Sequence, residues 1–137
     1  TAADCWKVEA AALMGKCLAD ALPKAEAELD QQVAAAHQRF RKWAREDESK
    51  VRRVWINTAA SELVKAQPAW SRYRDAHCAS RDGFVTGNDH GMARVRCKLE
   101  MTTARIEEVM AYSGGSKVDE EIWRTVHTDA ALTPSQP

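Results

Sequence analysis

The chain has 137 residues, enough for one domain with a core of its own, and its 20 lysine and arginine residues are balanced by 20 aspartate and glutamate residues. This balance leaves no strong field to gather nucleic acid or an anionic membrane, so sequence-independent nucleic-acid binding is not expected. No apolar run approaches the roughly 20 residues that a membrane-spanning helix needs, so we expect no membrane span.

The first third of the chain has the composition and spacing of long helices. Alanine, glutamate, lysine, arginine and leucine dominate, while glycine and proline are confined to a few places. Asp4 is expected to cap a first helix that ends near Gly15 or runs past Cys17, and Pro23 is expected to mark the entry to the next helix. One face of that next helix is predicted to be buried, because its apolar residues step by four and three: Leu29, Val33, Ala36, Phe40 and Trp43.

The middle of the chain returns to helical spacing after a charged segment. Residues 45–50 are all charge and serine, which predicts either a solvated helix surface or a break between two helices. Pro68 falls inside the helical pattern that follows. Because proline removes a backbone donor and crowds the preceding turn, we expect a kink there or a helix that begins near Gln67.

Large aromatic residues recur in these helical segments. Trp43, Trp55 and Trp70 stand beside leucine and valine at helical spacing, which predicts core residues rather than a surface that stacks on sugars or bases. Trp70 and Tyr73 are expected to anchor the core, while Arg74 or Asp75 of the same segment ties the helix end to a neighbour.

The last third of the chain contains one interior loop and one further long helix. Residues 79–91 hold three glycines and predict a loop, and a stripe from Met92 to Val109 predicts a helix that Gly114 and Gly115 end. Ser116 with Asp119 could cap a short last helix with an apolar side, before a tail that we expect to be disordered. The predicted fold is all-α, a small bundle of three to four main helices.

Four cysteines, Cys5, Cys17, Cys78 and Cys97, occur without a Cys-x-x-Cys motif, which favours disulfides over a metal knuckle or a redox motif. Of the three possible pairings we expect Cys5 with Cys17 and Cys78 with Cys97, because each pair is near in sequence. The second pair also brackets the glycine-rich loop. Loops of this size should each stabilise the fold by roughly 3 kcal/mol.

Metal binding and catalysis are not expected. His77, Cys78, His90 and Cys97 are ligand types that zinc prefers, but their spacing matches no structural zinc pattern, and a disulfide would remove the thiolates. Acidic neighbours such as Glu107 and Glu108 point in different directions on a helix, so they do not form a catalytic pair. The chain has no nucleophile elbow and no glycine-rich nucleotide loop, so we expect neither an enzyme nor a cofactor.

One element of the sequence is specific. Residues 66–78 read Ala-Gln-x-x-Trp-x-x-Tyr-Arg-Asp-x-x-Cys, and they are accompanied by Asp4-Cys5, Met14-Gly-Lys-Cys17, Gly91-Met-Ala with Cys97, and Thr103-Ala-Arg105. In this order the chain resembles the LprI-type lysozyme inhibitor family, a group of small helical, cysteine-paired bacterial envelope proteins. The resemblance implies a signature set with a structural role: Gln67, Trp70, Tyr73, Arg74, Asp75 and Arg105.

The resemblance covers about residues 4–109 and has clear departures. The charged stretch around residues 45–55 is longer than expected for the family, and Pro68 interrupts the signature helix. We therefore expect an LprI-like helical domain over residues 1–112 and an extension over residues 113–137 with a short helix and a disordered tail.

The function that the resemblance implies is inhibition by binding, without catalysis. The expected partner is a lysozyme or another peptidoglycan-cleaving enzyme, either a host lysozyme or the effector of a rival bacterium, in which case the chain is an immunity protein. A rigid basic surface complements the carboxylates of a glycosidase cleft. The preferred contact surface is the loop of residues 81–91 and the helix start after it, unless these side chains are merely solvated surface: Arg81, Asp82, His90, Arg94 and Arg96.

Localisation and a second function class also follow. The paired cysteines, and a chain that begins Thr1-Ala2-Ala3-Asp4 rather than with methionine, predict a periplasmic or extracellular protein from which a signal peptide has been removed. The alternative function is an envelope scaffold or assembly protein that binds a partner helix through an exposed aromatic stripe. Residues 118–127 could be such a docking helix, or could pack on the bundle itself.

Overall fold

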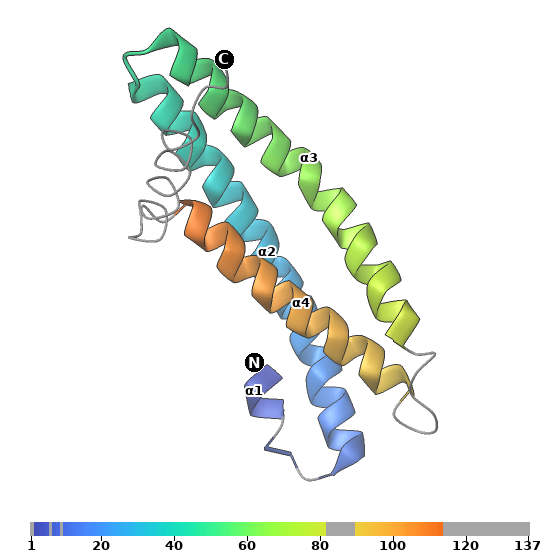
Figure 1. Cartoon of the computed structure of the whole chain (residues 1–137). Coiled ribbons are helices and arrows are strands. Elements are labelled where there is room, and N and C mark those ends of the chain that lie inside the picture. The colour runs from blue at the N-terminus through green and yellow to red at the C-terminus, as the bar shows by residue number, and fades with distance from the viewer. Residues whose placement is uncertain (1, 6, 9, 82–89, 114–137) are drawn as a thin grey trace, which may run out of the picture.

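The computed structural model describes residues 2–5, 7–8, 10–81 and 90–113, and this part of the chain is helical with no strand. The elements are α1 (Ala2–Cys5), α2 (Ala11–Glu46), α3 (Lys50–Arg81) and α4 (His90–Ser113). α2 and α3 form a long antiparallel hairpin, and α4 lies along it and contacts both helices (Figure 1). The all-α prediction is confirmed, with three main helices. Among the described residues, no helix has an apolar stretch long enough to cross a membrane.

The helix boundaries near the N-terminus differ from those predicted. α2 runs without a break through Gly15 and Pro23, so both the predicted helix end and the predicted helix entry are wrong. Asp4 lies inside α1 rather than at a helix cap. α3 likewise continues through Pro68 instead of beginning near Gln67. Both prolines are exposed, so their rings meet no neighbouring helix, and tertiary packing on either side outweighs the one hydrogen bond that each removes.

The charged segment of residues 45–50 is a break between two helices. α2 ends at Glu46, and the Asp47 carboxylate accepts hydrogen bonds from the Ser49 backbone N–H at 2.8 Å and from Arg52 Nε at 3.0 Å. The Arg52 bond, followed by that from Ser49, holds the pKa of Asp47 below its ordinary value. The Ser49 hydroxyl accepts from the Arg52 backbone N–H, so Ser49 caps α3.

The core has two parts along the length of the bundle. The larger part includes three residues of the stripe predicted for α2 and closes against α3 and α4: Leu29, Val33, Ala36, Leu63, Ile106 and Val109. The smaller part lies where α1, α2 and α4 meet, and consists of Cys5, Leu18 and Leu99. The stripes at a spacing of three and four therefore marked the buried faces of α2 and α4 correctly.

The aromatic residues follow the predicted pattern only in part. Trp70 is half-buried and packs against the larger core cluster. Trp55 is 66% exposed and Tyr73 is 60% exposed, so the predictions that they are core residues are wrong, and Trp43 at 37% is at the margin. A helical stripe is buried only where neighbouring helices cover it, and α4 stops well short of the turn between α2 and α3 (Figure 1).

Candidate functional site

A buried arginine joins all three long helices. Arg74 of α3 is only 5% exposed. Its Nη1 donates to Thr102 Oγ1 of α4 at 3.0 Å, and its Nε and Nη2 donate to Asp75 Oδ1 at 3.0 and 2.9 Å. Nη2 also lies 3.5 Å from Glu26 Oε2 of α2. A buried charge is stable only when it is paired and hydrogen-bonded, and Arg74 meets that condition with groups from three helices.

The partners of Arg74 are themselves satisfied. The fully buried Thr102 hydroxyl donates to the Lys98 carbonyl oxygen at 2.7 Å while it accepts from Arg74. The Lys98 ammonium lies 3.5 Å from Asp75 Oδ1, on the other side of the carboxylate. We call Glu26, Arg74, Asp75, Lys98 and Thr102 the Arg74 cluster. Its polar groups hold one another, which suits a structural tie better than a reactive centre.

Trp70 lies beside the Arg74 cluster under two guanidinium groups. The Arg74 Cζ is 5.4 Å and the Arg105 Cζ is 5.9 Å from its ring centroid, both within the range of cation–π contacts. Arg105 also donates to Gln67 Oε1 at 3.4 Å and to Glu108 Oε2 at 2.8 Å. The structure therefore gathers five of the six signature residues at the interface of α3 and α4.

Tyr73 is the signature residue that stays outside this group. It points to solvent and stacks on His77 with ring centroids 5.7 Å apart, so it does not anchor the core as predicted. The prediction that Arg74 or Asp75 ties the helix to a neighbour agrees with the structure. Sequence reasoning missed Glu26, Lys98 and Thr102. Thr102 alone carried a signal, as a polar residue in the apolar stripe of α4.

The Arg74 cluster makes the stability of the fold depend on pH. Burial alone would raise the pKa of Asp75, but the hydrogen bonds and charge of Arg74, with the charge of Lys98, outweigh it and hold that pKa below its ordinary value. A carboxylate with a lowered folded pKa stabilises the fold above its unfolded pKa, and this contribution is lost as pH falls through the folded pKa.

We therefore expect the free energy of unfolding to fall below about pH 4, and Asp75→Asn to flatten this decline. Urea unfolding of both proteins at pH 7 and pH 3 measures the effect. Glu48→Gln, which changes an exposed carboxylate at the turn, is the matched control. An equal loss between the two pH values in the wild type and in Asp75→Asn would contradict the assignment.

Two disulfides lie at the same end of the bundle. Cys5 is joined to Cys17, with Cα atoms 5.6 Å apart, and Cys78 to Cys97, with Cα atoms 5.5 Å apart, which are the two predicted pairs. The first ties α1 to the start of α2, and the second ties the end of α3 to the start of α4 (Figure 1). We call this end the stapled end. Within the described residues no group of three His, Cys, Asp or Glu side chains could hold a metal ion.

The predicted contact residues are found at the stapled end where the structure describes them. Arg81 is exposed at the end of α3, and Arg94 and Arg96 are exposed on the first turns of α4. Arg96 pairs with Glu100 at 3.0 Å on the same helix. Asp82 lies outside the described residues, and His90 is described only as the first residue of α4. The structure therefore brings three of the predicted arginines to one end of the bundle.

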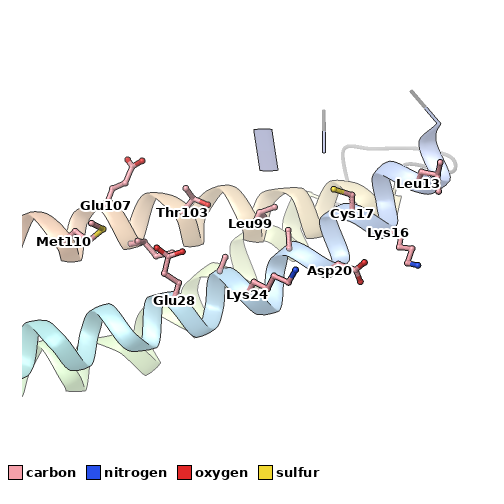
Figure 2. A pocket seen from close by; sticks show the side chains of 13 residues that line it. Leu13, Lys16, Cys17, Asp20, Lys24, Glu28, Leu99, Thr103, Glu107 and Met110 are labelled. Carbon is pink, nitrogen blue, oxygen red and sulfur yellow. The ribbon is translucent and has the colours of Figure 1, made fainter. Parts of the chain in front are cut away.

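A groove between α2 and α4 was not found by sequence reasoning. It has a volume of about 990 Å³ and a floor that includes the buried Leu99 and Ile106 (Figure 2). Its rim combines both signs of charge, from Lys16, Lys24, Asp20, Glu28 and Glu107. This mixed rim does not supply the basic surface that an acidic cleft requires, so the groove is a weaker candidate than the arginines of the stapled end.

These features define a small, disulfide-stapled helical protein whose signature residues hold its helices together. The family model described as lysozyme inhibitor LprI matches residues 5–109, and the chain belongs to this family. No curated protein matches the chain, and no solved structure does.

Proposed function

We propose that the protein is an exported inhibitor that binds a lysozyme or lysozyme-like peptidoglycan-cleaving enzyme and blocks its cleft. Membership of the lysozyme inhibitor family carries this proposal. The paired cysteines support export, because disulfides form and persist in oxidising compartments such as the periplasm. The target is either a host lysozyme or a rival's effector, and in the second case the protein serves as an immunity protein.

The proposed contact surface is the stapled end, with Arg81, Arg94 and Arg96 as its basic residues. Glycosidases cleave with two carboxyl groups set in a cleft, so an inserted basic surface is complementary in charge. Rigidity supports this choice. A surface that is already ordered loses less conformational entropy on binding, and both disulfides restrain the elements that carry these arginines.

The function is tested by lysis of peptidoglycan-walled cells, followed as loss of turbidity. We expect the protein, at equimolar amounts and at tenfold excess, to slow lysis by at least one of the hen-type, goose-type and invertebrate-type lysozymes or by an effector encoded beside its gene. Uninhibited lysis by every enzyme would refute the inhibitor function.

The contact surface is tested separately by charge reversal. Arg81→Glu with Arg94→Glu should raise the concentration for half-inhibition by about tenfold or more, because like charges would then meet across the interface. The matched control, Arg41→Glu with Arg45→Glu, reverses two exposed arginines near the opposite end of the bundle and should change it less than about twofold. Equal effects of the two double variants would show that overall charge, not the stapled end, governs binding.

A further inference from the structure

The end of the α2–α3 hairpin opposite the stapled end consists of only two helices. Val109, near the end of α4, packs in the larger core cluster with Ala36 and Leu63, and α4 ends at Ser113. Figure 1 shows α2 and α3 continuing together well beyond that point to their turn. We call residues 40–59 the hairpin tip. Two helices alone cannot enclose a core, so the tip lacks the cover that α4 gives to the rest of the hairpin.

Apolar side chains on the hairpin tip remain exposed as a result. Val51, Val54 and Trp55 are 58%, 63% and 66% exposed. Trp43 stands 18 residues, or five helical turns, after Ala25, which lines the groove between α2 and α4. Trp43 therefore faces the side of α2 along which α4 runs, and it is 37% exposed where Ala36 is fully buried. Its exposure is explained by the end of α4.

The hairpin tip and its approach are also basic. Residues 39–53 contain seven lysine and arginine residues and three aspartate and glutamate residues, a net charge of +4 in a chain whose net charge is zero. The tip therefore suits an occupant with an apolar side and acidic residues next to it.

One segment of this chain has that chemistry and follows directly from the end of α4. Residues 114–137 comprise 24 residues, and within them Val118, Ile122 and Val126 recur every four residues, with Trp123 beside them. The neighbouring residues 119–121 are all acidic. A helix over residues 117–127 would be about 16 Å long, enough to run along α2 from Phe40 to the turn, which is about 10 Å.

We propose that residues 117–127 dock on the hairpin tip of the same chain and extend the three-helix packing toward the turn. Gly114 and Gly115 let the chain leave α4 before the segment docks. The apolar side of the segment covers Trp43 and the flanking surface, and its acidic residues pair with the basic residues of the tip. This docking is independent of the proposed inhibitory function, which is assigned to the opposite end.

Hydrogen exchange on full-length protein tests the proposal. In Ile122→Ser with Val126→Ser, amides of residues 51–58 should exchange about tenfold faster or more, because the helix start they belong to loses its cover. Arg124→Ser with Thr128→Ser changes the opposite side of the segment and should leave exchange within about twofold of the wild type. Unchanged exchange in the first variant, or equal acceleration in both, would overturn the proposal.

Zero-length carbodiimide cross-linking distinguishes this docking from contact between two copies. In a mixture of ¹⁵N-labelled and unlabelled protein, we expect links from residues 119–121 to Lys42 or Lys50 within single chains. Links found only between labelled and unlabelled chains would show that a second copy occupies the tip. No link to either lysine, in protein where other neighbouring carboxylates and lysines do react, would likewise count against it.

Discussion

Replacement of Arg74 with alanine is expected to lower the free energy of unfolding by about 3 kcal/mol. The change removes the hydrogen bonds to Thr102 and Asp75 and the contact over Trp70, and it leaves a void among three helices. The loss stays below that of a fully buried ion pair, because the side chains of Glu26 and Asp75 are 44% and 50% exposed and remain solvated. Urea unfolding at pH 7 under oxidising conditions, followed by circular dichroism, measures it.

Two further variants show whether the geometry of the guanidinium matters. Arg74→Lys keeps the charge but loses the planar set of donors, so we expect an intermediate loss of about 1–2 kcal/mol. Arg72→Ala removes an exposed arginine from the same helix and should change stability by less than about 0.5 kcal/mol. If Arg74→Ala were no more destabilising than Arg72→Ala, the Arg74 cluster would not be the tie between the helices.

The features that could be predicted from the sequence are those set by local spacing. The stripe from Leu29 to Ala36 and that of α4 mark buried faces because a helix repeats every 3.6 residues whatever it packs against. The pairing of Cys78 with Cys97 was within reach for a similar reason, since the two cysteines flank one loop between two helices.

The features that could not be predicted depend on where other elements end. Trp55 has the spacing of a core residue, but its burial depends on whether a third helix reaches it, and α4 does not. The prediction of a tie at Arg74 or Asp75 agrees with the structure because a charge within an apolar stripe needs partners. Those partners, Glu26 and Thr102, come from helices far away in sequence, and only the packed bundle identifies them.

Removal of the Cys78–Cys97 disulfide, by Cys78→Ala with Cys97→Ala, is expected to lower the free energy of unfolding by about 3 kcal/mol. The bond closes a loop with a sequence separation of 19 residues, so its loss frees the unfolded chain substantially. Its two cysteines are 0% and 6% exposed and join two long helices, so the native state cannot regain comparable freedom without unfolding. Against a total stability of roughly 5–15 kcal/mol, this is a large fraction.

Removal of Cys5–Cys17 in the same way should cost much less, about 1 kcal/mol, although the chain-entropy argument alone would give nearly the same value for its separation of 12 residues. The difference lies in the folded state. α1 has only four residues, so without its disulfide it can leave the bundle while α2, α3 and α4 stay packed. The folded protein then gains freedom too, which offsets the gain of the unfolded chain. Equal losses in the two double variants would show that α1 is as integral to the core as the junction of α3 and α4.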